Sequence, residues 1–252
     1  MQRLLRKALT VCPALRDYAR TLTANHGKVV LIENSLFDPV KFANGNPGGG
    51  TDSDDADARR VRNVDEWLSR HPRDQVIAYA GTLEVYQGID KMLEAFSVAV
   101  RRLPLAGLLI VGGMPLEVES FRSLSDRLGL GDSVHFTGQV RQPEAQRLVA
   151  RAGVAISPRF AGNNTPMKIY QLMGAGVPMI ATRIESHTQI LNDEISVLSE
   201  VSTSALADAI VQALGHPDRL QAMAERARAW YEQEYSREAY TAKMRRLFAL
   251  VS

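Results

Sequence analysis

The sequence contains one cysteine, Cys12, among 252 residues. A single thiol excludes an internal disulfide and fits a reducing compartment, so we expect a cytoplasmic protein. One cysteine also cannot build a zinc site, and the histidines are scattered without metal-ligand spacing. We therefore expect no bound metal and no other resident cofactor. The five histidines are His26, His71, His135, His187 and His216.

Long apolar runs and a charge excess are absent as well. No run of about 18 apolar residues occurs, which excludes a membrane-spanning helix. Arg3, Arg6 and Lys7 interrupt the opening apolar residues, so a secretory signal peptide is not expected. The 30 basic residues nearly balance 28 acidic ones, for a net charge of +2, so we expect no nucleic-acid partner. The basic opening segment leaves peripheral contact with an anionic membrane face open.

The rest of the composition is that of an ordinary globular protein, 45% hydrophobic and 23% charged. From residue 75 onward, short apolar runs alternate with helical patterns. This alternation predicts an α/β fold, a doubly wound, Rossmann-like parallel sheet with right-handed crossovers. The expected strands are residues 76–80, 108–111, 134–137, 154–157, 179–182 and 196–198. The expected helices between them are residues 89–102, 116–128, 143–150, 166–173 and 187–191.

Further elements are expected on either side of this alternation. We expect a helix over 14–22, a strand over 28–32 and a short helix within 61–70. Residues 44–60 are rich in Gly, Asp and Asn and predict a flexible loop, because they bury too little surface to offset the cost of ordering. Three helices are expected at the end, over 204–215, 217–235 and 236–251.

The stretch PRFAGNNTPMKIYQLMGAGVPMIAT, residues 158–182, is the most informative of the chain. Thr165 is predicted to be the N-cap of a helix, with Pro166 in its first position. The amide hydrogens and positive dipole at such a helix start suit an anion such as phosphate. Lys168, one turn inside, adds a positive charge. A capped helix that binds nothing is the competing interpretation.

Three loops are expected to meet beside this helix. They are residues 81–88, 112–115 and 157–165, and each follows a predicted strand. Ligands of doubly wound sheets bind beyond the carboxyl ends of the strands, so the topology predicts that these loops converge on one pocket. No Gly-x-Gly-x-x-Gly follows the first of these strands, which disfavours an NAD-binding enzyme.

These motifs, taken in order, resemble the donor-binding domain of GT-B glycosyltransferases of the retaining family 4, the glycosyl transferases group 1. The segments that carry the resemblance are VIAYAGTLEVYQGID, LLIVGGMP, DSVHFTG, AGVAISP and residues 158–182. The resemblance implies that residues 1–35 are a remnant of a first GT-B domain and its crossover. It implies a nucleotide-sugar-binding domain over 36–235 and a C-terminal crossing helix over 236–252.

The resemblance also implies roles for individual residues. Lys168 and Asn163 are the candidates for catalysis. An Arg and a Lys that bind the diphosphate in the family correspond to Thr82 and Gln87 here, and paired glutamates correspond to Asn163 and Gln171. The donor-binding candidates are Gly81, Thr82, Gln87, Gly88, Gly112, Gly113, Arg159, Asn164, Thr165, Pro166 and Gln171.

Four neutral residues where the family has charged ones leave two hypotheses. The first is a glycosyltransferase that, without a metal and with retention of configuration, transfers a sugar from a nucleotide-diphosphate sugar to a saccharide or lipid-linked acceptor. The acceptor domain would then come from a separate chain, from a homodimer, or from the rest of a longer chain of which this sequence is a fragment. The second is a non-catalytic nucleotide-sugar-binding or partner-regulating remnant. Glu185 and Arg141 are weaker candidates for ligand contact, and His187 and Thr188 are expected to cap a helix.

Overall fold

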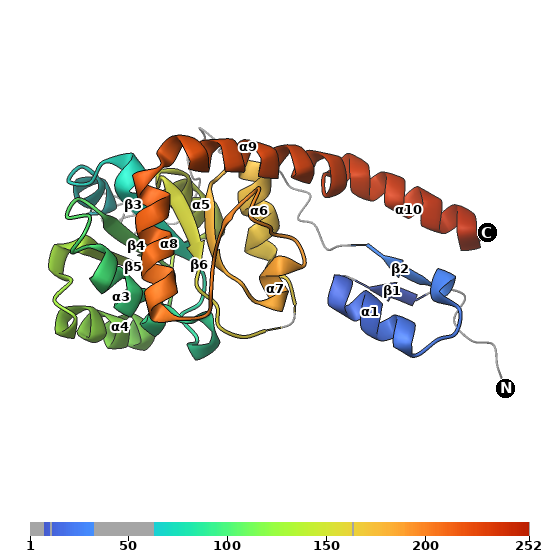
Figure 1. The fold of residues 1–252 in the computed structure, drawn as a ribbon, viewed down its shortest axis with the longest axis horizontal. Coiled ribbons are helices and arrows are strands. Elements are labelled where there is room, and N and C mark those ends of the chain that lie inside the picture. The colour runs from blue at the N-terminus through green and yellow to red at the C-terminus, as the bar shows by residue number, and fades with distance from the viewer. Residues whose placement is uncertain (1–7, 11, 33–62, 163, 252) are drawn as a thin grey trace, which may run out of the picture.

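The computed structural model describes residues 8–10, 12–32, 63–162 and 164–251. Asn163, the predicted loop over 44–60, and the opening basic residues Arg3, Arg6 and Lys7 lie outside the described residues. Within the described part, the expected α/β architecture is confirmed (Figure 1).

A six-stranded sheet forms the centre of the molecule, and all its neighbouring strands run parallel. The spatial order is β5-β4-β3-β6-β7-β8, so the strand order reverses direction between β3 and β6. Such a reversal opens a crevice at the carboxyl ends of the two central strands. The strands are β3 (Val76–Ala80), β4 (Gly107–Val111), β5 (Val134–Gly138), β6 (Val154–Ser157), β7 (Met179–Thr182) and β8 (Val197–Ser199). Each predicted strand lies within one residue of these bounds.

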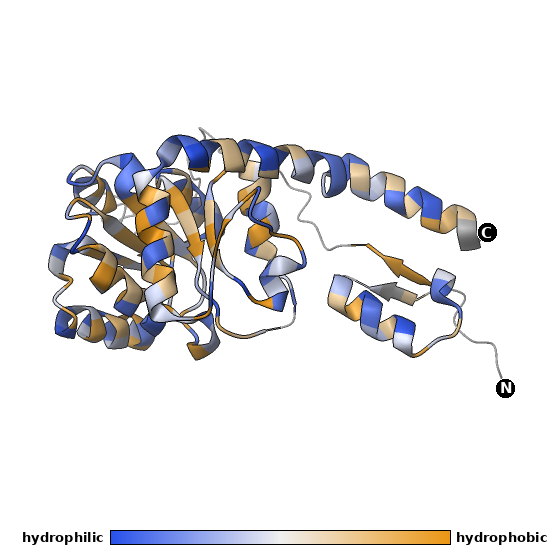
Figure 2. Cartoon of the chain, in the orientation of Figure 1, coloured by the Kyte–Doolittle hydropathy of each residue, from blue (hydrophilic) through white to orange (hydrophobic). Residues whose placement is uncertain are grey.

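Helices cover both faces of the sheet, because successive side chains of a strand point to opposite faces. Ile77 and Tyr79 belong to a core with α3, α4 and α8, whereas Val76 and Ala78 pack with α5 on the other face. Figure 2 colours these strands mostly as hydrophobic, and the outer helices alternate. The helices are α3 (Ile89–Ala99), α4 (Pro115–Arg127), α5 (Gln142–Ala150), α6 (Met167–Ala175), α7 (Glu185–Thr188), α8 (Thr203–Gly215), α9 (Pro217–Glu234) and α10 (Arg237–Val251).

The bounds of two predicted helices, α3 and α7, differ from the structure by more than two residues. α3 ends at Ala99, three residues early, because residues 100–102 form a turn. α7 begins at Glu185, because the carbonyl of Ile184 already accepts the backbone N–H of His187 and of Thr188. His187 and Thr188 are therefore inside the helix and do not cap it. Residues 63–68 are helical, within the predicted 61–70 segment.

A small separate sheet lies near the N-terminus. β1 (Ala8–Thr10) pairs in parallel with β2 (Val29–Leu31), and α1 (Pro13–Thr21) connects them. Of the two strands and the α-helix of this unit, β1 is the one that the sequence analysis did not predict. The unit touches the main body where the Ala14 N–H donates to the side-chain oxygen of Gln189, 3.0 Å away. Among the described residues, no helix is both long and apolar enough to cross a bilayer.

Candidate functional site

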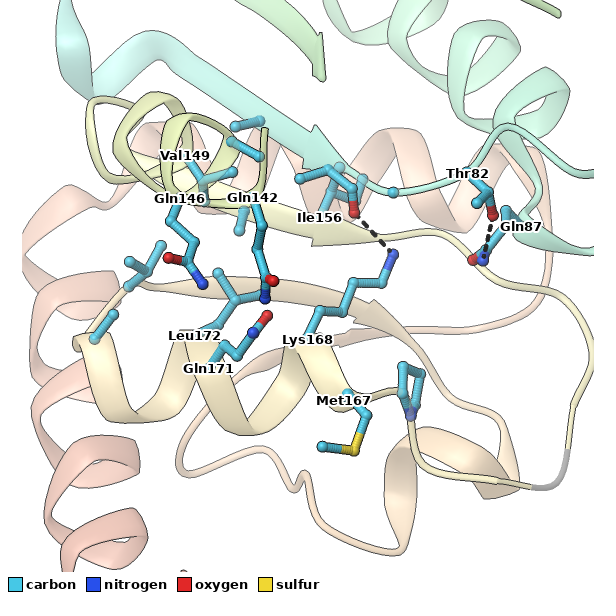
Figure 3. Close-up of a pocket in the computed structure, with 18 of the residues that line it drawn as sticks. Thr82, Gln87, Gln142, Gln146, Val149, Ile156, Met167, Lys168, Gln171 and Leu172 are labelled. Atoms are coloured by element: carbon cyan, nitrogen blue, oxygen red, sulfur yellow. Dashed lines mark hydrogen bonds between the residues drawn. The ribbon is translucent and has the colours of Figure 1, made fainter. Parts of the chain in front are cut away.

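A cavity of about 460 Å³ opens where the strand order reverses. It begins at the loops that follow β3 and β6 and continues between α5 and α6 over the sheet (Figure 3). The predicted convergence is thus present for two of the three loops. Nine of the predicted site residues line this cavity: Gly81, Thr82, Gln87, Arg159, Asn164, Thr165, Pro166, Lys168 and Gln171.

Lys168 reaches from α6 towards the end of β3. Its Nζ lies 3.5 Å from the carbonyl oxygen of Ala80 and 4.3 Å from the centre of the Tyr79 ring. The Tyr79 hydroxyl donates to the carbonyl of Thr82 at 2.6 Å, which fixes the ring below the ammonium. Burial and then the charge of Arg159 lower the pKa of Lys168 to about 7. The lysine therefore gains from an anion that offsets both effects.

Arg159 is the second cation of the cavity, and only 7% of it is exposed. Its Nη1 donates to the carbonyl of Asn164 at 3.3 Å, and its guanidinium carbon lies 5.1 Å from the centre of the Tyr86 ring. Its Nε is buried and has no hydrogen-bond partner among the described residues. A guanidinium held this way keeps donors available for a planar or tetrahedral oxyanion.

Two further buried polar atoms of the cavity wall lack partners. They are the side-chain carbonyl of Gln87 and the hydroxyl of Thr165, within the part of the chain that the structure describes. Gln87 is 6% exposed and Thr165 is 8% exposed. Buried polar groups are nearly always satisfied in native proteins, so a cluster of orphaned ones in a cavity indicates a polar ligand.

The predicted cap of α6 is wrong. The helix begins at Met167, Pro166 occupies the N-cap position with ψ of 131°, and no side chain caps the first turn. Thr165 lies one residue too early, and its hydroxyl is the orphaned one, so it cannot bond to the first amides of the helix. The observed arrangement favours anion binding more than the predicted one does, because the Thr165 hydroxyl does not compete with an anion for the first amides of α6.

The other predicted glycines pack loops together without lining the cavity. A Cβ on Gly88, where φ is 70°, would lie 2.4 Å from the Pro158 carbonyl. A Cβ on Gly112 would lie 2.2 Å from the carbonyl of Gly81, and one on Gly113 would overlap Leu83. Their contact with a donor stays a prediction. Glu185 and Arg141 do not line the cavity either.

Sequence reasoning missed two groups of residues. Gln142 and Gln146 of α5 line the cavity, and their spacing of four residues on one helix was the available signal. The second group is a buried network below Arg159. His187 is fully buried, its Nδ1 lies 2.8 Å from the Thr182 carbonyl, and its Nε2 lies 2.9 Å from the Ser157 hydroxyl.

The geometry of this network determines which ring nitrogen of His187 carries the hydrogen. A carbonyl only accepts, so Nδ1 of His187 carries the hydrogen and Nε2 accepts from Ser157. The Thr182 hydroxyl in turn donates to the carbonyl of Arg159. Burial lowers the pKa of His187 to about 4, against a smaller opposing effect of the Thr182 bond. The His187 ring is therefore neutral. It links Ser157 at the end of β6 to Thr182 at the end of β7, and Thr182 in turn bonds to the backbone of Arg159.

No group of three or more His, Cys, Asp or Glu side chains able to hold a metal ion occurs within the described ranges. The cavity wall itself contains no Asp or Glu among the described residues. The site therefore offers cations, amide groups and hydroxyls. This set fits an anionic ligand that also carries hydroxyl or carbonyl groups.

Several known proteins are similar to this chain in sequence or in structure. A D-inositol 3-phosphate glycosyltransferase of Segniliparus rotundus is 27% identical over 162 residues, which are 62% of this chain and 36% of the relative. A GDP-mannose-dependent alpha-(1-6)-phosphatidylinositol monomannoside mannosyltransferase of Mycobacterium tuberculosis is 31% identical over 63% of this chain and 43% of its own. The chain thus spans less than half the length of these curated relatives.

Solved structures of other proteins have the same fold as this chain. Anabaena Alr3699/HepE in complex with UDP superposes with a TM-score of 0.77 at 17% identity, over 98% of this chain and 64% of that one. Sucrose-phosphate synthase from Thermosynechococcus elongatus gives 0.72 at 23% identity, over 98% of this chain and 59% of that one. The fold is that of GT-B glycosyltransferases, of which this chain covers about three fifths. Residues 74–216, more than half of the chain, match the model of the family described as glycosyl transferases group 1. The chain belongs to that family.

Proposed function

We propose that this chain binds a nucleotide-diphosphate sugar in the cavity between α5 and α6 and takes part in transferring the sugar. The observation that carries the proposal is the association of Lys168 and Arg159 with three orphaned, buried polar atoms on one cavity wall. The uncapped start of α6 adds amide hydrogens to the same place. A diphosphate accepts hydrogen bonds from Lys168, Arg159, the Thr165 hydroxyl and these amides, whereas the side-chain carbonyl of Gln87 accepts from a sugar or ribose hydroxyl.

The diphosphate belongs at the mouth of the cavity. Lys168 supplies the charge there, and the side-chain amide of Gln87, whose Nε2 also donates to the Thr82 hydroxyl at 3.4 Å, supplies a neutral hydrogen bond. Cleavage of the glycosidic bond leaves negative charge on the diphosphate, which these preorganised groups stabilise. No metal is needed in this scheme, because a lysine, an arginine and a helix start provide the positive potential.

The sugar and ribose hydroxyls are assigned to amide side chains. Gln171 lines the cavity one turn beyond Lys168, and Asn164 lies at the loop before α6. Asn163 is kept as a catalytic candidate by resemblance only. No general base stands out beside Lys168. In a retaining reaction of the type that the family resemblance implies, the leaving phosphate accepts the proton of the acceptor hydroxyl.

The acceptor is proposed to be a saccharide or a lipid-linked molecule, in line with the names of the curated relatives. A lipid-linked acceptor would bring the chain to the inner membrane face as a peripheral protein. A separate domain chain, a second copy of this chain, or the rest of a longer chain of which this sequence is a part is the proposed source of the acceptor-binding residues. Residues 1–35 and 236–252 are proposed to flank the nucleotide-sugar domain as the resemblance implies.

Four neutral residues favour a second candidate function. Thr82, Gln87, Asn163 and Gln171 stand where the family has two cations and two glutamates. Neutral hydrogen bonds hold a ligand more weakly than charge-assisted ones. A non-catalytic domain that binds the nucleotide sugar and regulates a partner would keep the cavity and lose turnover.

Two measurements separate these functions. In isothermal titration with nucleoside diphosphates, at least one should bind, and Lys168→Ala should weaken it by about 1–3 kcal/mol. Binding that is unchanged in Lys168→Ala removes this lysine from the site. Hydrolysis or transfer of a radiolabelled nucleotide sugar is then measured with and without candidate partner chains. Tight binding without turnover in every mixture favours the regulatory function.

A further inference from the structure

His187 is a buried polar residue that the proposed transfer does not use. It is fully buried, and it is not one of the described residues that line the cavity. Its Nδ1 lies 2.8 Å from the Thr182 carbonyl oxygen, and its Nε2 lies 2.9 Å from the Ser157 hydroxyl. A leucine would fill a similar volume without the free-energy cost of burying a polar ring. Both ring nitrogens have partners, so the imidazole serves hydrogen bonding and not only packing.

The imidazole joins the ends of two neighbouring strands, β6 and β7. Ser157 and Ala181 are the last residues paired between these strands. Arg159 lies two residues beyond Ser157, so the β6–β7 ladder does not hold its backbone. The Thr182 hydroxyl donates to the carbonyl oxygen of Arg159 in its place, and this hydroxyl oxygen lies 3.2 Å from Nδ1 of His187. His187 therefore contacts both side chains, Ser157 and Thr182, that fix the chain around Arg159.

The fixed backbone limits where the Arg159 guanidinium can lie. The outer end of the side chain is restricted as well, because the guanidinium carbon lies 5.1 Å from the centre of the Tyr86 ring and Nη1 donates to the Asn164 carbonyl at 3.3 Å. With both ends held, the buried Nε, which lacks a partner among the described residues, keeps one orientation. An arginine restricted in this way loses less conformational entropy when it binds an anion.

A neutral ring suits the place behind the cations of the cavity. Lys168 and Arg159 already bring two positive charges to the cavity wall, and no described lining residue is an Asp or Glu. Burial lowers the pKa of His187 to about 4, and the charges of Lys168 and Arg159 act in the same direction. The neutral imidazole thus supplies one donor and one acceptor and adds no third charge.

We propose that Thr182 and His187 are positioning residues that hold Arg159 for the diphosphate of the donor. Neither residue lines the cavity, so both act through the backbone of Arg159 and not on the ligand. His187 donates to the carbonyl oxygen of Thr182, and the Thr182 hydroxyl donates to that of Arg159. The inference rests on the proposed function, since it assigns residues that support that same site.

Thr182→Val is the first test, because valine keeps the shape of threonine and removes its hydroxyl. Titration of the full chain with UDP, GDP and inorganic pyrophosphate should show about three- to tenfold weaker binding of each anion that the unmodified chain binds, the loss expected for one hydrogen bond. Thr182→Ser restores the hydroxyl and should restore the affinity. Thr137→Val, at the end of β5, is the matched control. Thr137 is also buried, its hydroxyl donates to the Gly138 carbonyl at 2.7 Å, and it does not line the cavity, so this variant should bind all three anions as before.

A double-mutant cycle separates positioning of Arg159 from a general loss of stability. Arg159→Ala alone should weaken binding about tenfold or more, because it removes a charged donor. Thr182→Val added to Arg159→Ala should weaken binding no further, because no guanidinium remains to be held. His187→Leu should behave like Thr182→Val in both backgrounds, and it carries the test if Thr182→Val does not fold.

Four results overturn the inference. The first two are unchanged affinity in both Thr182→Val and His187→Leu, and unchanged affinity in Arg159→Ala. The other two are a Thr182→Ser variant that binds as weakly as Thr182→Val, and equal losses from Thr182→Val with and without the guanidinium. Each of them leaves the proposed function standing if Lys168→Ala still weakens binding. An unmodified chain that binds none of the three anions overturns both.

Discussion

The ammonium of Lys168 lies 4.3 Å from the centre of the Tyr79 ring, so this cation of the cavity packs on an aromatic face, and no carboxylate of the described residues pairs with it. The ring attracts the charge only weakly compared with an anion. Burial and Arg159 hold the pKa of Lys168 near 7. A bound diphosphate would raise that pKa, so binding and protonation are linked.

The first prediction is that nucleoside diphosphate affinity falls as the pH rises above about 7. Below pH 7 the lysine already carries its proton, and above it binding must take a proton up, at a cost of up to tenfold per pH unit. Titration between pH 7 and 9 avoids the second phosphate ionisation, which lies near pH 6. Repeating it in buffers of different ionisation enthalpy should reveal proton uptake. Lys168→Met should abolish both effects, and an unchanged pH slope in that variant would contradict the assignment.

The second prediction concerns Gln171, three residues after Lys168 on the same helix. Side chains at this spacing are neighbours, so a carboxylate at position 171 favours the charged lysine. Gln171→Glu should therefore raise the pKa of Lys168 and move the midpoint of the pH dependence of binding upward. Gln221→Glu adds the same charge on the exposed face of α9 and should leave the midpoint in place. A midpoint that moves equally in both variants would show a general charge effect.

The third prediction compares two glycines with the same backbone angle. Gly88 and Gly129 both have φ of 70°, but a Cβ on Gly88 would lie 2.4 Å from the Pro158 carbonyl, whereas one on Gly129 meets nothing within 4 Å. Both alanine variants lose about 1–2 kcal/mol from the left-handed conformation. Gly88→Ala should lose a further 1–3 kcal/mol or so from overpacking and weaken nucleotide binding, because Pro158 precedes Arg159. Chemical denaturation and titration measure both, and equal losses would exclude the packing contribution.

Much of this molecule follows from its local sequence. Buried runs such as residues 76–80, followed by glycine, predicted every strand of the large sheet, because short apolar segments between helices have few alternatives in an α/β fold. β1 was missed because three residues in a basic opening segment carry no such signal. The cap of α6 failed for a related reason. Thr165 has N-cap propensity and Pro166 favours the first helical position, yet the helix begins one residue later, with Pro166 at the N-cap position.

The residues at the loops after the strands could be predicted from the sequence, whereas those that line the cavity between α5 and α6 could not. Gly81, Lys168 and Gln87 follow strands whose carboxyl ends must meet, so topology alone brings them together. Gln142 and Gln146 face Gln171 only because β3 pairs with β6, which places α5 beside α6. That pairing joins residues 77 positions apart in the chain, such as Ile77 and Val154. The buried bond between His187 and Ser157 depends on the same long-range arrangement.

The last prediction concerns that histidine. The folded-state pKa of His187 is about 4, below its ordinary value of 6.5, so the unfolded chain binds more protons between these pH values. Stability is therefore complete above about pH 6.5 and falls as the pH drops towards 4, by up to roughly 3 kcal/mol. Thermal unfolding from pH 4.5 to 7.5 should show this decline. His187→Gln should be less stable at pH 7, because it disturbs the bonds to Ser157 and Thr182, yet its stability should depend less on pH. His216→Gln, at an exposed position before α9, is the control. If the stability of His187→Gln depends on pH in the same way as that of the unmodified chain, other groups cause the dependence, and protonation of His187 does not destabilise the fold.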